Sequence, residues 1–238
     1  MKAFLLAAGL GTRLRPLTEH VPKCLVTVGG VALLDIWLDA LAKAGVDHVL
    51  VNTHHHADQV TAHVAARSTG PTVTLSYEPE LLGSAGTLRA NRDFVAGEDE
   101  FLAINADNLT DFDLGRLVDA HRAHRAADPD TVATLTVFRA PDPTRCGIVE
   151  LSAGEVRGFE EKPRTPRSDL ANAGIYAFAP AALDHIPPDA PADIGYHLLP
   201  RLVAAPGRVR AIRLDGFFID IGTPDALERA RREWRGTS

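Results

Sequence analysis

The first 140 residues alternate short apolar runs with amphipathic segments, and this alternation limits the folds open to the chain more than any other feature. The runs at residues 2–8 (KAFLLAA) and 46–53 (VDHVLVNT) are typical of strands buried on both faces of a parallel sheet. Between them, residues 32–45 repeat apolar side chains at helical spacing and end on Gly45, a residue common at helix C-termini. The same alternation predicts strands at 72–77, 100–107 and 131–138 and helices at 56–67, 84–94 and 113–126. Strands and helices in strict turn predict an α/β fold with a mostly parallel central sheet and helices on both faces.

The second part of the chain, residues 141–238, has a different texture and is expected to be β-rich. A helical pattern over 193–205 contains Pro200, which should disturb it. A closing helix is predicted at 224–234, with Pro224 near its first turn. Short strands are predicted at 146–151, 155–161, 171–178, 208–214 and 217–221. No linker or repeat separates the two parts, so we expect one domain over residues 1–238.

Charge and cysteine content exclude several classes of protein. The formal net charge of −6 argues against a general nucleic-acid binder, which usually carries a basic excess. Cys24 and Cys146 fit neither a zinc spacing nor a disulfide framework, which favours a reduced, cytoplasmic protein. No apolar run approaches the roughly 18 residues that span a bilayer. We therefore expect a cytoplasmic protein with neither nucleic-acid nor membrane partners.

The stretch LLAAGLGTRLRP (residues 5–16) ends a predicted strand in a glycine loop. Gly9 and Gly11 allow a tight turn and let backbone amides approach an anion. Arg13 can contact phosphate oxygens in pairs, and Lys23 adds a point charge. The loop lacks the Gly-Lys-Ser/Thr ending of a P-loop, and Leu14 stands where a dinucleotide fingerprint needs its third glycine. The loop therefore predicts a phosphate site outside these two classes, the alternative being an ordinary turn with solvated basic residues.

The longer string LAAGLGTRLRPLTEHVPK (residues 6–23) resembles the opening motif of the sugar-1-phosphate nucleotidyltransferases. That motif reads Leu-Ala-Ala-Gly, any residue, Gly-Thr-Arg, and later Pro-Lys. The resemblance continues along nearly the whole chain, in NAD (105–107), CGIVE (146–150), FEEKP (159–163), NAGIY (172–176) and FIDIGTPDAL (218–227). The pattern is closest to guanylyltransferases acting on mannose or manno-heptose 1-phosphate. It implies a Rossmann-like domain with a nucleotide-binding half (1–140), a sugar-binding and closing half (141–238), and no β-helix domain.

The resemblance implies a reaction between two anions. An oxygen of a sugar 1-phosphate attacks the α-phosphorus of a nucleoside triphosphate, pyrophosphate leaves, and an NDP-sugar forms. The protein must mainly neutralise charge and align the reactants. Mg²⁺ would bridge phosphates and prefers carboxylate ligands, for which the resemblance implies Asp107 and Asp220. Asp111 and Asp113 compete with Asp107 in sequence, but they can also simply cap the next helix.

Site residues carried over from the family fall into three sets. The catalytic set is Arg13 for the β- and γ-phosphates, Lys23 for the α-phosphate and Lys162 for the sugar phosphate. The nucleotide set comprises Leu6, Ala8, Gly9, Gly11, Thr12, Arg13, Glu78, Gly83 and Ser84, and the sugar set comprises Gly147, Glu161, Lys162 and Asn172. The chain departs from the family at Cys146, where the usual residue is tyrosine, so sugar packing at that corner is not carried over.

The nucleobase is predicted from the segment YEPELLGSAGTL (77–88). Thymidylyl- and uridylyltransferases commonly place a glutamine five residues before the glycine, and Glu78 takes that place before Gly83. A carboxylate only accepts hydrogen bonds, which suits the adjacent N1–H and 2-amino donors of guanine. The sequence thus favours GTP, with Glu80 as the substitute for Glu78. Both glutamates could instead be exposed loop residues.

The sequence leaves other functions open. They are a thymidylyl- or uridylyltransferase, a silent homologue that binds a sugar nucleotide, and a glycosyltransferase using DFD (111–113), although that motif follows its strand too late. The partners expected are the small-molecule substrates, and a homo-oligomer is open. The run HHH (54–56) is expected to be a solvated strand-to-helix connection, because consecutive side chains on an extended segment point in opposite directions. Cys24 is expected to be a buried thiol.

Overall fold

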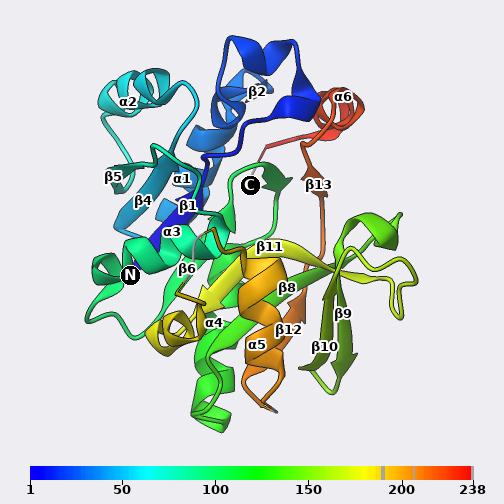
Figure 1. The fold of residues 1–238 in the computed structure, drawn as a ribbon. Helices are drawn as coiled ribbons and strands as arrows, with labels where there is room; N and C mark the ends of the chain where they lie inside the picture. The colour runs from blue at the N-terminus through cyan, green and yellow to red at the C-terminus, as the bar shows by residue number, and fades with distance from the viewer. Residues whose placement is uncertain (189–190, 206, 237–238) are drawn as a thin grey trace. The chain divides into compact units, whose positions relative to one another are not determined.

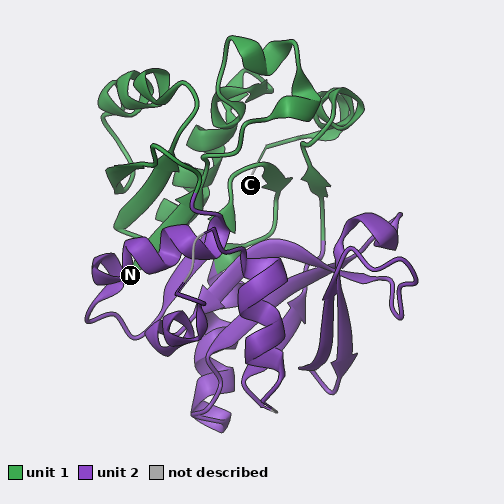
Figure 2. Ribbon diagram, viewed as in Figure 1, with its two compact units in different colours: residues 1–81, 104–114, 216–238 green, residues 82–103, 115–215 purple. Residues whose placement is uncertain are grey.

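A computed structural model describes residues 1–188, 191–205 and 207–236 of the chain (Figure 1). The chain forms two compact units whose segments alternate along the sequence (Figure 2). Unit 1 contains residues 1–81, 104–114 and 216–238, and unit 2 contains residues 82–103 and 115–215. The division of roles at residue 140 stays a prediction, because these units are defined by packing alone.

Unit 1 is built on parallel strands in the order β5–β4–β1. Strand β1 (Lys2–Leu6) pairs with β4 (His48–Thr53), which pairs with β5 (Thr72–Tyr77). The register sets Ala3 opposite Val49 and Val49 opposite Val73. The strands expected at 2–8, 46–53 and 72–77 are thus confirmed. Their connections carry helices α1 (Leu33–Lys43) and α2 (Ala57–Ala65).

Helix α1 shows how the sequence pattern becomes packing. Its apolar residues Leu33, Leu34, Ile36, Trp37, Leu38 and Leu41 are all buried. The helix ends as expected at Gly45, which adopts φ +79°. The amide of Val46 donates to the carbonyl of Leu41, and that of Gly45 donates to Ala42. This double closure satisfies the last carbonyls of the helix and needs a left-handed residue at Gly45.

The rest of unit 1 consists of short strand pairs and the last helix. Strands β7 (Asn108–Thr110) and β13 (Phe218–Asp220) pair antiparallel, as do β2 (Thr27–Val28) and β3 (Val31–Ala32). Helix α6 (Pro224–Glu233) begins at Thr223, whose hydroxyl accepts from the amide of Ala226. These elements share one apolar cluster, which contains Leu14, Val26, Val28, Leu33, Ile36, Leu109, Ile219, Ile221, Leu227 and Ala230.

In the described part of unit 2, strands follow the order β11–β8–β12–β10–β9, with a further pairing of β9 to β11 that closes the ring. Strands β8 and β12 pair in parallel, whereas β10–β12, β10–β9, β11–β8 and β11–β9 pair antiparallel. The α/β fold is confirmed, and its sheet is mixed, parallel in unit 1 and largely antiparallel in unit 2. The strands are β8 (Ala133–Arg139), β9 (Gly147–Ser152), β10 (Glu155–Glu161), β11 (Leu170–Phe178) and β12 (Val209–Arg213); β6 (Phe101–Asn105) runs from unit 2 into unit 1.

The α-helices α3 (Ser84–Ala90), α4 (Leu114–Ala127) and α5 (Leu199–Val203) follow the predicted helical segments. Pro200 disturbs its segment as expected, since a π-helical turn (Ile194–Leu198) precedes α5 and the proline occupies the first turn of α5. Short 3₁₀ helices cover Thr12–Leu14, Leu17–Glu19, Lys23–Leu25, Arg92–Val95, Pro143–Arg145 and Pro180–His185. Within the described part of the chain, no helix is long and apolar enough to span a bilayer.

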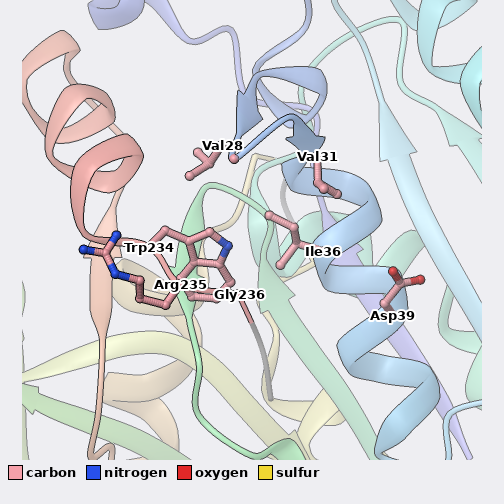
Figure 3. A pocket seen from close by; sticks show the side chains of 8 residues that line it. Val28, Val31, Ile36, Asp39, Trp234, Arg235 and Gly236 are labelled. Atoms are coloured by element: carbon pink, nitrogen blue, oxygen red, sulfur yellow. The ribbon is translucent and has the colours of Figure 1, made fainter.

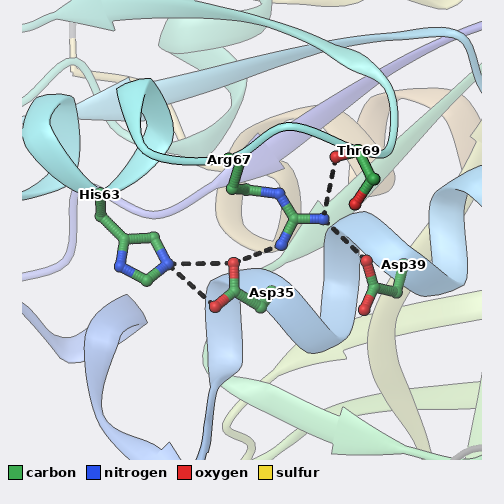
Figure 4. A network of polar contacts seen from close by, with 5 residues as sticks. All are labelled: Asp35, Asp39, His63, Arg67 and Thr69. Carbon is green, nitrogen blue, oxygen red and sulfur yellow. Dashed lines mark hydrogen bonds and ion pairs between the residues drawn. The ribbon is translucent and has the colours of Figure 1, made fainter.

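A polar network ties α1 to α2 in unit 1 (Figure 4). The Arg67 guanidinium donates to Asp35, to Asp39 at 2.7 Å and to the carbonyl of Thr69. His63 Nε2 contacts the same Asp35 carboxylate at 2.9 Å. Although burial alone would lower it, the pKa of Arg67 is raised by its hydrogen bonds to Asp39 and Asp35. The network therefore holds the start of α1 to the end of α2 with charged hydrogen bonds.

Because His121 of α4 is buried, we expect the protein to lose stability in acid. This histidine is fully buried, and burial, together with the charges of Arg125 and His124, lowers its pKa to about 4. The unfolded chain takes up this proton near pH 6.5, so stability is complete above that pH and is lost as pH falls toward 4. Relative to His121→Leu, the wild-type free energy of unfolding should fall by about 3 kcal/mol between pH 7 and pH 4 in urea titrations. Parallel pH profiles for the two proteins would contradict this expectation.

Candidate active site

The two predicted metal ligands lie at one end of a short strand ladder in unit 1, with Asp107 just before β7 and Asp220 at the end of β13. Asp220 of β13 pairs with Asn108 of β7, and the amide of Ile221 donates to the carbonyl of Asp107 at 2.9 Å. Leu109, Ile219 and Ile221 of the same ladder are buried in the apolar cluster of unit 1. The ladder thus anchors its apolar residues in the core, while Asp107 is half-buried and Asp220 exposed. Sequence positions 113 residues apart are brought together by this pairing.

Two predicted cationic residues join the aspartates. Lys23 Nζ donates to Asp107 Oδ2 at 2.7 Å, and the lysine is 8% exposed. Arg13 lies beside Asp220 across Gly222, since a Cβ at Gly222 would come within 2.7 Å of Arg13 Nη2 and 3.0 Å of Asp220 Oδ1. Leu14, next to Arg13, is buried in the core and fixes the base of this side chain. Unit 1 therefore gathers Arg13, Lys23, Asp107 and Asp220, and Gly222 is a residue that the sequence analysis did not single out.

The donor set suits a magnesium ion held partly by substrate. Among the described residues, no group of three or more His, Cys, Asp or Glu side chains could hold a metal. Mg²⁺ in phosphoryl chemistry usually keeps waters and takes one or two carboxylates together with substrate phosphates. Asp107, just before β7, and Asp220, the last residue of β13, provide two carboxylates at one end of this ladder. The residues present therefore fit Mg²⁺ bound together with a nucleotide, and they do not form an all-protein cage.

The glycine loop has a defined backbone. Gly11 adopts φ +63°, and its carbonyl accepts from the amide of Leu14 and from Thr18 Oγ1, each at 2.8 Å. A Cβ at Gly11 would lie 2.8 Å from Thr18 Cγ2, so both conformation and space require glycine. Gly9, by contrast, is exposed, and a Cβ there would meet no atom within 4 Å. Space for a ligand therefore exists at Gly9, while Leu6, Ala8 and Thr12 keep their nucleotide roles as predictions.

The predicted base-reading glutamate is buried. Glu78 is 2% exposed, and its Oε1 accepts from Asn52 Nδ2 at 2.9 Å. The Oδ1 of Asn52 accepts in turn from the amides of Ala7 and Ala8. Glu80, the substitute in the sequence analysis, is exposed on the same loop. Base reading by Glu78 stays a prediction, and Glu80 is the more accessible of the two carboxylates.

The histidine run corrects one detail of the sequence analysis. The segment is not extended throughout, because His56 adopts φ +54° at the start of α2. The rings of His55 and His56 consequently lie side by side, with centroids 3.8 Å apart, instead of pointing in opposite directions. All three histidines hydrogen-bond to backbone carbonyls, so the connection is more than a solvated linker.

In unit 2 the predicted sugar residue Glu161 lies between two glycines. A Cβ on Gly147 or on Gly195 would come within 2.5 Å of Glu161 Oε2. Burial raises the pKa of the Glu161 carboxyl; the charge of Lys162 lowers it in part, and that of Asp193 raises it further. The carboxylate is thus held in a narrow slot that only glycines permit. Gly195 is a second residue that the sequence analysis missed, since an isolated glycine in a helical pattern carries no specific signal.

Lys162 stands at the end of β10 in a left-handed conformation, with φ +49°. Its amide donates to the carbonyl of Cys146, and its Nζ lies 3.7 Å from Glu161 Oε1. The same Nζ lies 5.8 Å from the ring centroid of Tyr196, an exposed residue of the π-helical turn. A non-glycine residue with positive φ costs free energy, and such residues concentrate at functional sites. Unit 2 thus brings Gly147, Glu161 and Lys162 together and adds Tyr196.

Three other predicted residues of unit 2 make structural contacts. Asn172 donates to the Tyr176 hydroxyl at 2.6 Å and accepts from the amide of Gly174, across a bulge of β11. The Ser84 hydroxyl donates to Asp193 Oδ1 and accepts from the amide of Ile194. A Cβ on Gly83 would lie 2.5 Å from the carbonyl oxygen of Ala192. Ligand roles for Asn172, Ser84 and Gly83 stay predictions, and the segment 192–194 that caps α3 was not foreseen.

The two cysteines should differ in reactivity. Cys24 is 2% exposed, and burial raises the pKa of its thiol to about 12, as expected of a buried thiol. Cys146 is only half-buried, next to Gly147 at the start of β9. A thiolate is the reactive species, so a disulfide reagent should label Cys146 alone in the native protein and both cysteines in denaturant. Rapid native labelling of Cys24, read by mass spectrometry of peptides, would contradict this assignment.

A pocket of about 500 Å³ lies elsewhere in unit 1 (Figure 3). Trp234 and Ile36 line it together with Val28 and Val31 of the β2–β3 hairpin. Trp234 also packs against the apolar cluster of unit 1. The sequence-predicted site residues do not line this pocket.

Comparison with known proteins gives consistent matches. A family model described as nucleotidyl transferase matches residues 2–235. The mannose-1-phosphate guanylyltransferase catalytic subunit beta of Xenopus tropicalis is 35% identical over 229 residues, which cover 94% of this chain and 62% of that protein. Glucose-1-phosphate thymidylyltransferase of Streptomyces griseus is 38% identical over 235 residues, 96% of this chain and 64% of that protein. The chain thus spans a little under two thirds of the length of these relatives.

A solved structure is similar over the whole chain. It is a Bacillus anthracis protein, provisionally described as a glucose-1-phosphate thymidylyltransferase and crystallised with sucrose. The TM-score is 0.83 at 25% identity, and the match covers 100% of this chain and 98% of that one. This similarity supports the α/β architecture described above.

Proposed function

Because the chain belongs to the nucleotidyl transferase family, we propose that it transfers a nucleotidyl group from a nucleoside triphosphate to a sugar 1-phosphate. The products are an NDP-sugar and pyrophosphate. The observation that carries the proposal is the gathering of Arg13, Lys23, Asp107 and Asp220 in unit 1. Two cations beside two carboxylates that could hold a metal are what the binding of a metal–triphosphate complex requires.

The proposed chemistry is a single displacement. An oxygen of the sugar 1-phosphate forms a bond to the α-phosphorus, the bond from that phosphorus to the α–β bridging oxygen breaks, and the electron pair leaves with pyrophosphate. Lys23 opposes the charge that grows at the α-phosphate. Arg13 binds the β- and γ-phosphates and stabilises the leaving pyrophosphate through paired hydrogen bonds. No covalent intermediate with the protein is needed.

Asp107 and Asp220 would hold Mg²⁺ with the triphosphate in this proposal. When bound, the ion supplies charge neutralisation at the phosphates and lowers the repulsion between the two reactants. Lys23 is paired with Asp107 at 2.7 Å, so its ammonium is already oriented before a nucleotide binds. This preorganisation avoids reorienting the ammonium during the reaction.

Unit 2 is proposed to bind the sugar 1-phosphate. Lys162 contacts the phosphate, and Glu161 accepts hydrogen bonds from sugar hydroxyls. The slot between Gly147 and Gly195 fixes where the Glu161 carboxylate can lie, which would define the orientation of the sugar. A mannose- or manno-heptose-type sugar is favoured; the Xenopus tropicalis relative is named as a mannose-1-phosphate guanylyltransferase. The reaction is proposed to run in the cytoplasm.

GTP is the proposed nucleotide, and a dTTP or UTP enzyme is the second candidate. Acidic residues at 78 and 80 suit the paired donors of guanine. The similarity to a glucose-1-phosphate thymidylyltransferase is the reason that dTTP or UTP is kept as the second candidate. Glu78→Gln and Glu80→Gln separate the two glutamates, because loss of GTP preference should follow only the residue that contacts the base.

The test is pyrophosphate release from four nucleoside triphosphates, each combined with several sugar 1-phosphates and Mg²⁺. We expect the fastest release with GTP and mannose 1-phosphate or a manno-heptose 1-phosphate, and none when the sugar phosphate is omitted. Turnover with dTTP or UTP but not with GTP would support the second candidate. Absence of release with every pair would reject the enzyme and favour a silent homologue.

A further inference from the structure

The side chains of His55, His56 and Gln59 contact the carbonyl oxygens of three successive residues, Thr18–His20. His55 Nε2 lies 3.3 Å from the carbonyl oxygen of Thr18, His56 Nε2 lies 3.0 Å from that of Glu19, and Gln59 Nε2 donates to that of His20 at 2.9 Å. A carbonyl oxygen only accepts, so each ring nitrogen must carry the proton and donate. Three successive carbonyls are thus held by three side chains from the start of α2.

The backbone at His56 is adapted to this arrangement. His56 has φ +54°, a left-handed conformation that histidine adopts uncommonly. That conformation places the rings of His55 and His56 side by side, 3.8 Å between centroids, so both can address the same loop. An extended backbone would send the second ring to the opposite side. Strained conformations persist where the surrounding structure requires them. Here the relevant surroundings are the backbone carbonyls that the two rings contact.

The loop that they hold is directly connected to the glycine loop. Thr18, whose carbonyl accepts from His55, is 2% exposed. Its hydroxyl donates to the carbonyl of Gly11 at 2.8 Å, and the amide of Leu14 donates to the same oxygen at 2.8 Å. The position of Thr18 therefore sets the orientation of the Gly11 peptide. Arg13 lies in the turn that starts there, so its backbone depends on Thr18 as well.

The same strand-to-helix connection also holds the other side of the glycine loop. Asn52, at the end of β4, accepts from the amides of Ala7 and Ala8 at 2.6 and 3.3 Å. Its own amide donates to Glu78, and His54 Nδ1 lies 2.7 Å from the carbonyl oxygen of Glu78. Residues 52–59, the clamp segment, thus contact the chain before the glycines, the chain after Arg13 and the loop of Glu78.

We propose that the clamp segment positions the glycine loop for triphosphate binding, a role that rests on the proposed function. None of its side chains needs to touch the substrate. His55, His56 and Gln59 fix Thr18–His20, Thr18 fixes Gly11, and Gly11 fixes the turn that carries Arg13. Groups that bind a transferring phosphate must be held within a fraction of an ångström, and supporting hydrogen bonds provide that precision. Loss of the clamp should therefore weaken nucleotide use and leave sugar phosphate binding unaffected.

The test compares three proteins with the wild type. The first carries His55→Leu and His56→Leu, which remove both ring donors. The second carries His55→Gln and His56→Gln, whose amides can still donate to carbonyls. The control is His48→Leu, at the opposite end of β4, where ring atom Nε2 lies 2.8 Å from the hydroxyl of the exposed Thr74. Steady-state kinetics give KM separately for GTP and for the sugar 1-phosphate, and thermal unfolding reports the stability of each protein.

We expect the leucine pair to raise KM for GTP by about tenfold or more, because small misplacements of binding groups are costly. The glutamine pair should recover most of that loss, the KM for the sugar 1-phosphate should stay constant, and His48→Leu should match the wild type. Equal changes in both KM values, a fall in kcat that follows thermal destabilisation alone, or a glutamine pair as impaired as the leucine pair would each overturn the proposal.

Two milder variants guard against a leucine pair that does not fold. Gln59→Leu removes one donor from a half-buried position, and Thr18→Val removes the hydroxyl that holds Gly11 while keeping the shape of the side chain. Each should raise KM for GTP selectively, and unchanged values in both would overturn the clamp. A wild-type protein without any turnover would instead reject the proposed function, so the two failures are distinguishable.

Discussion

Replacing Asp107 with asparagine is expected to lower kcat by about a thousandfold, the largest effect of any single change in unit 1. The substitution removes one of the two carboxylates available to a divalent ion. It also removes the negative partner of Lys23, which lies 2.7 Å away and is almost fully buried. The amide oxygen of asparagine can still accept from Lys23, so the fold should survive. Pyrophosphate release at saturating Mg²⁺, GTP and sugar 1-phosphate measures the effect.

The matched control for Asp107→Asn is Asp113→Asn. Asp113 is an exposed aspartate just before α4 and was an alternative ligand by sequence. Its replacement should leave kcat within about threefold of the wild type, as is usual for surface changes. A nearly normal rate in Asp107→Asn, or equal losses in the two variants, would remove Asp107 from the metal site.

Replacing Lys162 with methionine should lower kcat/KM for the sugar 1-phosphate by about a hundredfold to a thousandfold. Methionine keeps most of the length of the side chain and, like lysine, is unbranched at Cβ, so it should meet the φ of +49° at a similar cost. The variant loses only the ammonium, which would otherwise neutralise the incoming phosphate. Glu161 loses its close cation as well, and because Lys162 lowers the pKa of Glu161, that pKa should rise further. The loss should therefore fall mainly on kcat/KM for the sugar 1-phosphate.

The comparison protein for Lys162→Met is Lys43→Met, which alters an exposed lysine in the last turn of α1. It should show wild-type values for both substrates. If Lys162→Met instead raised KM for GTP and left kcat/KM for the sugar 1-phosphate unchanged, the assignment of Lys162 to the sugar phosphate would have to be abandoned.

The sequence predicted well those features that depend on local pattern. Helix α1 ends at Gly45 because glycine readily adopts the left-handed conformation that this closure needs. A glycine at the end of a helical pattern can be seen in the sequence without knowledge of the fold. That Asp107 and Asp220 lie at one end of the β7–β13 ladder agrees with the sequence analysis, which related the two residues only through resemblance to a family; their metal role stays a prediction. No periodicity places two residues 113 positions apart on one ladder, since register in a sheet depends on partners distant in sequence.

Features that depend on side-chain geometry could not be predicted. The left-handed backbone at His56, which turns two histidines toward one loop, has no signature in composition or period. Gly195 and Gly222 matter because Glu161 and Arg13 approach them closely, a tertiary event. The burial of Glu78 against Asn52 was hidden for the same reason, since Asn52 near the end of β4 and Glu78 just after β5 meet only in the folded chain.

The most direct measurement uses sugar 1-phosphate labelled with oxygen-18 at its non-bridging phosphate oxygens, incubated with GTP, Mg²⁺ and enzyme. Mass spectrometry then locates the label in the products. Direct attack of the sugar phosphate on the α-phosphorus predicts that all label remains in the NDP-sugar and none enters pyrophosphate. Label in pyrophosphate, or GMP formed without any NDP-sugar, would contradict nucleotidyl transfer to a sugar 1-phosphate.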